Sequence, residues 1–244
     1  MVGYGYAVLD QLANRVFEAV LFDMDGTLID STSAVIRSWD RWAAEHDIPP
    51  IELAGWHGVP SASVVRGLLP TDRQEVGIAR IHQIEIADVD GIVVLPGATE
   101  ALDALSTAKT AIATSCTVPL AWARIRASQL VPPSVLVTAD DIVRGKPAPD
   151  PYLEAARRLG ADPIQCLVVE DAPAGLESAR AAGCATLAVT TTTQPEDLVA
   201  DAVVKDLSDV RFEVTPAGIR VRPAYLASAT QGAAEATASE GAAR

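Results

Sequence analysis

Two aspartates, Asp23 and Asp25, directly follow the apolar run 20–22 and precede Gly26. In an extended segment, side chains two positions apart point to the same side, and a glycine allows a sharp turn with inward-pointing amides. Such a carboxylate pair can divide a phosphoryl transfer, with one aspartate attacking phosphorus and the other moving protons, once a cation offsets their repulsion. The spacing therefore indicates phosphoryl-transfer chemistry, and the alternative is a surface turn rich in Asp and Gly.

Groups suited to holding a phosphate follow further along the chain. Thr114 and Ser115 close an apolar run, where a hydroxyl and a backbone amide can bind a phosphate oxygen without adding charge. Lys146 lies in a proline-rich stretch, which restricts the backbone and would hold the ammonium in place. Taken singly, these residues are equally consistent with an ordinary strand-end hydroxyl and a solvated loop cation.

A second acidic pair, Glu170 and Asp171, ends another apolar run, and the segment 172–175 opens a helix. Hard oxygen ligands of this kind suit Mg²⁺, which binds few carboxylates and keeps several waters. The ordinary alternative is a polar strand end. The chain therefore carries four candidate elements of a phosphoryl-transfer site: the Asp23 and Asp25 pair, Thr114 with Ser115, Lys146, and the Glu170 and Asp171 pair.

The four elements, in this order, resemble the motifs of the haloacid dehalogenase (HAD) superfamily, whose nucleophile motif is DxDGT. The resemblance runs from about Val16 to the region of Thr190, and it is closest to the branch of sugar and polyol phosphatases and phosphoglucomutase-like enzymes. It implies a Rossmann-like α/β core with a small helical cap inserted after the first motif, which opens and closes over the phosphate.

The resemblance also implies a role for each motif residue. Asp23 would attack phosphorus and form an aspartyl-phosphate, while Asp25 would protonate the leaving oxygen and later activate water. Mg²⁺ would be held by Asp23, the backbone carbonyl of Asp25, Asp171 and Glu170. The residues expected to hold the phosphate oxygens are Thr114, Ser115 and Lys146. No organic cofactor is expected.

Departures from neighbouring families narrow the reaction. Dehalogenases of the superfamily lack the second aspartate, which is present here as Asp25, and the segment 31–95 has no lysine to form the Schiff base of phosphonate hydrolases. The mutase branch has a histidine where this chain has Val35, which favours a hydrolase. A phosphosugar mutase, a receiver-like regulator and a non-catalytic phosphate-binding protein stay open as alternatives.

Alternating strand and helix patterns predict a mostly parallel sheet covered on both faces, with ligands at the carboxyl ends of its strands. The predicted strands are 19–22, 110–114, 135–138, 166–170, 185–189 and 202–204, and a hairpin is predicted at 211–222. The predicted core helices are 99–106, 152–159 and 174–182, the last two stopped by glycines. We expect a catalytic core formed by residues 1–30 and 96–223, a helical cap at 31–95 and a disordered tail at 224–244.

The cap segment carries the candidates for recognising the leaving group. Ser33 is predicted to cap a first cap helix, and further helices are predicted at 64–69 and 76–86. The tryptophans of the first helix, Trp39 and Trp42, are expected to pack in a core, with a ligand-stacking wall as the alternative. By resemblance to a specificity loop, His57, Gly58 and Arg66 are candidate substrate contacts.

Composition limits the partners. A formal net charge of −13 argues against nucleic acid, because duplex binding depends on cationic contacts. Three cysteines without CxxC spacing indicate neither a disulfide framework nor a zinc site, and no apolar run reaches membrane-spanning length. We expect a cytoplasmic monomer or weak homo-oligomer that binds no membrane and hydrolyses a small sugar or polyol phosphate, such as glycerol phosphate or a hexose 6-phosphate.

Overall fold

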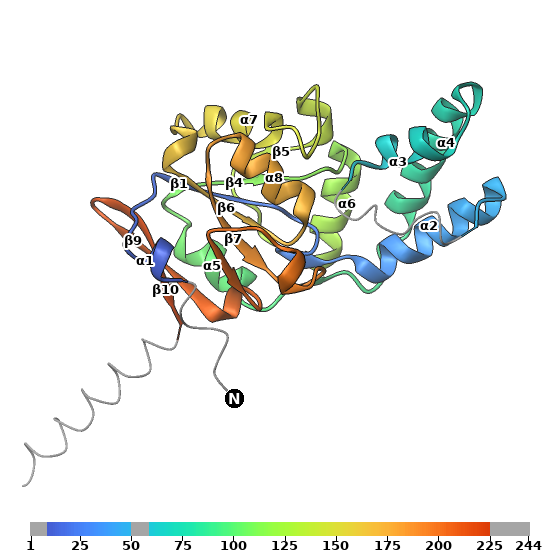
Figure 1. Cartoon of the computed structure of the whole chain (residues 1–244). Helices are drawn as coiled ribbons and strands as arrows, with labels where there is room; N and C mark the ends of the chain where they lie inside the picture. Colours follow the sequence, from blue (N-terminus) through green and yellow to red (C-terminus); the bar gives the residue numbers. More distant parts are fainter. Residues whose placement is uncertain (1–8, 50–58, 225–244) are drawn as a thin grey trace, which may run out of the picture.

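The computed structural model describes residues 9–49 and 59–224, and its centre is a six-stranded parallel sheet. The strands lie in the order β5-β4-β1-β6-β7-β8 (Figure 1). Their bounds are β1 Ala19–Phe22, β4 Lys109–Ala113, β5 Val135–Val137, β6 Cys166–Glu170, β7 Ala185–Val189 and β8 Ala202–Val204. The predicted α/β class is confirmed, and so is each predicted strand to within one residue.

Helices cover both faces of this sheet. Alternate residues of β1 belong to different cores: Val20 and Phe22 pack with α5 and α6, whereas Ala19 and Leu21 pack with α7 and α8. The bounds of these helices are α5 Ala98–Ala104, α6 Val118–Ser128, α7 Asp150–Leu159 and α8 Pro173–Ala181. Gly160 ends α7 in the left-handed conformation, as its position in the sequence predicts. Helix α6 was not predicted.

A β-hairpin closes one edge of the core. Strands β9 (Val210–Thr215) and β10 (Gly218–Pro223) pair antiparallel, which confirms the predicted hairpin, and the short helix α1 (Asp10–Ala13) contacts β10. Phe212 meets Phe22 of β1 edge to face, with ring centroids 5.8 Å apart. The hairpin therefore contributes side chains to the hydrophobic core. Short 3₁₀ turns lie at Ala139–Asp141, Pro163–Gln165, Pro195–Asp197 and Leu207–Asp209.

Three helices extend to one side of the sheet (Figure 1): α2 Thr32–His46, α3 Ser61–Leu68 and α4 Thr71–Ala87. They have their own hydrophobic cluster, centred on Trp42, Val65 and Ile81. A two-stranded ribbon, β2 (Ile29–Asp30) with β3 (Val93–Val94), brings the two ends of this segment together. We call α2–α4 the outer helices.

The start of α2 corrects one prediction. Ser33 lies inside the helix and Ser31 occupies the N-cap position without a side-chain cap bond, while the Asp30 carboxylate accepts the backbone N–H of Thr32 at 3.0 Å. The Ser31 hydroxyl instead donates to Asp25 at 2.6 Å. The Ser31 side chain thus bonds to Asp25 of the first motif and not to the backbone of the helix.

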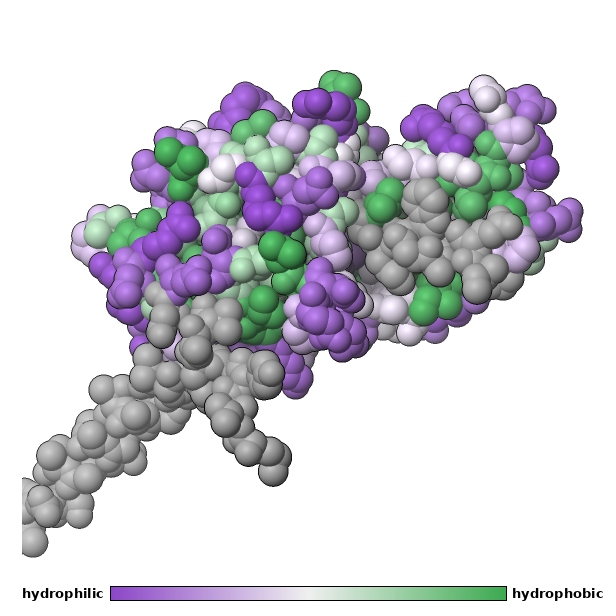
Figure 2. Space-filling model, viewed as in Figure 1, coloured by the Kyte–Doolittle hydropathy of each residue, from purple (hydrophilic) through white to green (hydrophobic). Residues whose placement is uncertain are grey.

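The surface view in Figure 2 shows hydrophobic residues as separate patches among hydrophilic ones, and the far ends of the outer helices are largely hydrophilic. Individual exposed apolar side chains include Val131 and Val143. Among the helices of residues 9–49 and 59–224, none is long and apolar enough to span a membrane.

Candidate active site

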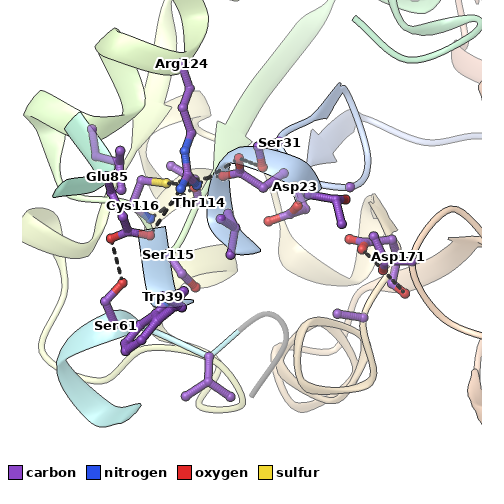
Figure 3. Close-up of a pocket in the computed structure, with 18 of the residues that line it drawn as sticks. Asp23, Ser31, Trp39, Ser61, Glu85, Thr114, Ser115, Cys116, Arg124 and Asp171 are labelled. Atoms are coloured by element: carbon purple, nitrogen blue, oxygen red, sulfur yellow. Dashed lines mark hydrogen bonds and ion pairs between the residues drawn. The ribbon is translucent and has the colours of Figure 1, made fainter. Parts of the chain in front are cut away.

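The motif residues meet where three adjacent central strands end. Asp23 follows β1, Thr114 follows β4, and β6 ends in Glu170 with Asp171 next. Because parallel strands present their carboxyl ends at one edge, residues about ninety and one hundred and fifty positions apart come together there. They line a cavity of about 350 Å³ between this edge and the outer helices (Figure 3).

Three carboxylates form a buried acidic cluster on the floor of this cavity. Asp23, Glu170 and Asp171 are 7%, 1% and 3% exposed, and each offers an oxygen within 4.8 Å of the others. Burial raises the pKa of Asp23 to about 7 although Lys146 opposes the shift, and burial with the neighbouring acids raises the pKa of Asp171 well above its ordinary value. Such a cluster keeps its charge only with cations close by.

One cation, Lys146, is built into the cluster. Its ammonium is buried and lies 2.5 Å from both Asp23 Oδ1 and Glu170 Oε1. Burial alone would lower the pKa of Lys146, but the two carboxylates raise it well above its ordinary value. Lys146 therefore stays charged, and three carboxylates still outnumber it.

Glu170 is held from several sides. The Tyr152 hydroxyl donates to Oε1 at 2.9 Å, and the backbone N–H groups of Asp171 and Ala172 donate to Oε2 at 2.9 and 3.1 Å. These bonds fix the position of the carboxylate, and the pKa of Tyr152 is raised well above its ordinary value by burial and by Glu170. The phenol thus remains a donor.

Two glycines make room for the acids. A Cβ on Gly26, which has φ +87°, would lie 2.2 Å from Asp171 Oδ2, and a Cβ on Gly175 would lie 1.7 Å from Glu170 Oε1. Real atoms do not approach so closely, so any side chain at either position would displace a carboxylate. The backbone is therefore shaped around this cluster.

Thr114 and Ser115 line the same cavity as Asp23 and Lys146, as the sequence predicts. Thr114 is buried, and its Oγ1 accepts the backbone N–H of Cys116 at 3.1 Å, which leaves its own proton to donate. The structure thus brings together Asp23, Asp25, Thr114, Ser115, Lys146, Glu170 and Asp171.

The cap candidates fare differently. His57 and Gly58 lie outside the described residues. Arg66 is exposed on α3, lies 3.9 Å from Glu75 and is not among the described residues that line the cavity, so its contact with a substrate stays a prediction. Val64 of the same helix lines the cavity, and a residue two positions further points to another side of a helix.

A buried charge network was missed by sequence reasoning. Arg124 of α6 contacts Asp25 at 2.9 Å and Glu85 of α4 at 3.2 Å, and Ser61 of α3 donates to Glu85 at 3.0 Å (Figure 3). Both Arg124 and Glu85 are about 5% exposed or less. The burial of Glu85 could have been predicted from its spacing, because it lies four positions after the buried Ile81 on the same helix.

Cys116 and Trp39 both line the cavity, and Trp39 was expected in a core, with a ligand-stacking wall as the alternative. Cys116 Sγ lies 3.2 Å from Asp25 Oδ2, and burial raises its pKa well above the ordinary value, so it stays a thiol rather than a nucleophile. Trp42 is fully buried and donates to the Gly77 carbonyl, which confirms a packing role, whereas Trp39 packs on the same cluster and also borders the cavity.

A comparison with family models assigns this fold and its acidic, lysine-bridged edge to a class of hydrolases. The model of the haloacid dehalogenase-like hydrolases matches residues 17–183, and the chain belongs to this family. It is 42% identical to hexitol phosphatase A of Escherichia coli over 81% of this chain and 95% of that protein.

Other relatives are also phosphatases. The chain is 32% identical to glycerol-1-phosphate phosphohydrolase 2 of Saccharomyces cerevisiae, over 79% of this chain and 84% of that protein. A solved hydrolase from Pseudomonas syringae matches with a TM-score of 0.72 and 27% identity, over 78% of this chain and 94% of that chain. Sugar and polyol phosphatases thus recur among its relatives.

Proposed function

We propose that this protein is a Mg²⁺-dependent phosphatase that hydrolyses small sugar or polyol phosphates through an aspartyl-phosphate on Asp23. The observation that carries the proposal is the position of Asp23, whose carboxylate lies 2.5 Å from the Lys146 ammonium inside a cluster of three buried acids at the end of β1. A carboxylate beside a fixed cation, at the floor of an enclosed cavity, is suited to attack a bound phosphate.

Each neighbour has a task in this proposal. Asp23 attacks phosphorus, and Asp25 gives a proton to the leaving oxygen and then takes one from the attacking water. Thr114, Ser115 and Lys146 bind the phosphate oxygens on which charge spreads during transfer. The Arg124 and Ser31 contacts hold the Asp25 carboxylate in position.

The residues present fit a divalent ion. Three carboxylate oxygens converge within 4.8 Å, Lys146 balances only part of their charge, and Gly26 and Gly175 keep the space beside them clear. Asp23, Asp171, Glu170 and the carbonyl of Asp25 are the proposed ligands, and oxygen-only ligands suit Mg²⁺. When bound, the ion would lower the repulsion between the acids and the incoming phosphate.

The names of two relatives support a small polyol or sugar ester as the substrate. Hexitol phosphatase A and the glycerol-1-phosphate phosphohydrolases are named for such substrates, and the chain covers most of both. Val35 lines the cavity at the position where the mutase branch has a histidine, which supports a hydrolase reaction over a phosphosugar mutase reaction. We also propose that residues 31–95 form a cap over a core of 1–30 and 96–223, since the outer helices have their own hydrophobic cluster.

The test is Asp23→Asn, assayed for phosphate release from glycerol phosphate and hexitol phosphate with Mg²⁺ and with a chelator. An amide is a far weaker nucleophile and metal ligand, so kcat should fall by more than about a hundredfold, and chelation should inactivate the wild type. Asp103→Asn, an exposed acid of α5, is the matched control and should keep full activity. Retention of more than about a hundredth of the activity by Asp23→Asn would contradict the covalent route.

A further inference from the structure

The wall of the cavity away from the acidic cluster carries a buried carboxylate, Glu85. Glu85 lies on α4 and is held by Arg124 of α6 and Ser61 of α3, so two outer helices and one core helix meet at this group (Figure 3). Glu85 is 4% exposed and lines the cavity with Arg124 and Ser61. Burying a charged group is costly, and this one lies outside the residues proposed to bind the phosphate, so we ask what it contributes to the site.

We propose that Glu85, positioned by Arg124 and Ser61, is the specificity residue of this site: it selects leaving groups that carry neutral hydroxyls and rejects leaving groups that carry a second anionic charge. This inference rests on the proposed phosphatase function. It concerns the leaving group and not the phosphate, because Figure 3 shows Asp23 and Asp171 on the opposite side of the pocket from Glu85 and Ser61.

Attraction of hydroxyls follows from the unused acceptor capacity of Glu85. An ionised carboxylate has about four lone-pair positions, and the bonds from Arg124 and Ser61 use one on each oxygen among the residues that the structure describes. A sugar or polyol hydroxyl can donate to the remaining positions. Val35, Trp39 and Val64 line the cavity as an apolar surface on which the C–H groups of such a chain can pack.

Rejection of anions follows from the charge balance. Among described residues that line the cavity, six are acidic and only two, Lys146 and Arg124, are cationic. Lys146 is shared by Asp23 and Glu170, and Arg124 is shared by Asp25 and Glu85, so neither is available to a second anionic group. A carboxylate or second phosphate beside Glu85 would meet a like charge in a poorly solvated place, which is strongly unfavourable.

The experiment measures kcat/KM for three esters, a hexitol phosphate, n-hexyl phosphate and 3-phosphoglycerate, in wild type and in Glu85→Gln. Glu75→Gln is the matched control, because Glu75 is an exposed acid on the same helix. In Glu85→Gln the ratio of hexitol phosphate to hexyl phosphate should fall about tenfold, since a charged acceptor is lost. The ratio of phosphoglycerate to hexyl phosphate should rise about tenfold, because a like charge disappears and Arg124 loses one of its two carboxylate partners.

The outcomes separate this inference from the proposed function. If the wild type hydrolyses none of the esters and no chromogenic phosphate monoester, the phosphatase proposal fails. If it hydrolyses them but both ratios are unchanged in Glu85→Gln, the specificity role alone is overturned. A gain with phosphoglycerate supports the role and does not arise from misfolding. Should Glu85→Gln not fold, Ser61→Ala replaces it: its ratio of hexitol to hexyl phosphate should fall about threefold, and an unchanged ratio overturns the role.

Discussion

Asp23 has charged neighbours of opposing effect: Lys146 favours its ionised form, and the two acids Glu170 and Asp25 disfavour it. Burial is the largest influence and raises its pKa from 3.8 to about 7, so folding of the metal-free protein takes up a proton near neutral pH. The contribution of this group to stability is then fully present below about pH 4 and is lost as the pH rises through about 7. Asp171 adds to the same trend.

This charge state leads to a prediction about Mg²⁺. Because metal ligands must be deprotonated, the ion competes with protons for Asp23 and Asp171, and the metal-free protein is least stable where both are ionised. The rise in melting temperature on adding Mg²⁺ should therefore be larger at about pH 8 than at about pH 6. Calorimetry at the two pH values measures it, with Asp103→Asn as a control that keeps the difference. Equal shifts would mean that these acids do not bind the ion.

Residues of the first and last motifs were predictable because each follows an apolar strand and carries a chemically informative side chain. Arg124 and Glu85 were not, because a single arginine or glutamate on a helix usually faces water, and only the packing of α4 against α6 buries these two. Arg66 was a candidate by resemblance to a specificity loop, and the structure places it on an exposed side of α3, 3.9 Å from Glu75.

At the level of elements, helix α8 begins against the site, and its third residue, Gly175, touches Glu170. Replacing glycine by alanine in a helix normally stabilises by about 1 kcal/mol. Here the added Cβ would lie 1.7 Å from Glu170 Oε1, in a carboxylate already fixed by Lys146 and Tyr152.

Gly175→Ala should therefore lower the melting temperature and raise the Mg²⁺ concentration needed for half-maximal activity at least about tenfold, as expected when a metal ligand is displaced. Activity titrations with Mg²⁺ and thermal unfolding measure the two effects. Gly91→Ala is the control: its Cβ would meet nothing within 4 Å, so its effect is confined to the backbone strain of φ +75°. An unchanged Mg²⁺ requirement in Gly175→Ala would show that Glu170 can move without cost.

The sequence predicted most strands of the sheet but not helix α6 or the short ribbon of β2 and β3. Strands β1, β6, β7 and β8 have the predicted bounds, since short apolar runs buried on both faces stand out between polar segments. Helix α6 was missed because it starts at a proline-containing stretch and its apolar positions do not form a clear stripe. The ribbon of β2 and β3 has only two residues on each strand, and its pairing spans more than sixty positions of chain, which local patterning does not reveal.

At the scale of the whole molecule, the hairpin β9–β10 completes the core on one side of the sheet. Phe212 is 5% exposed and meets Phe22, the last residue of β1, whereas Val214 on the same strand is 45% exposed. Phe212→Ala should destabilise the protein by about 3–5 kcal/mol through the cavity it leaves, and Val214→Ala by less than about 1 kcal/mol.

Denaturant unfolding followed by fluorescence or circular dichroism measures both free energies. Since Phe212 does not itself line the cavity, the folded variant should keep its kcat within about twofold of the wild type. Equal free energies for the two variants would mean that the hairpin does not contribute to the core.

The strand order has a further consequence for how activity arises during folding. β1 lies between β4 and β6, and its partners are about ninety and one hundred and fifty residues further along the chain. Neither hairpin formation nor local helix formation can assemble this edge, because it requires two long-range chain closures that are entropically costly and kinetically slow. A fragment that ends before Asp171 would lack part of the proposed catalytic centre, however well its early segments fold. Recovery of catalysis on refolding therefore reports the completed central sheet rather than the helices that form around it.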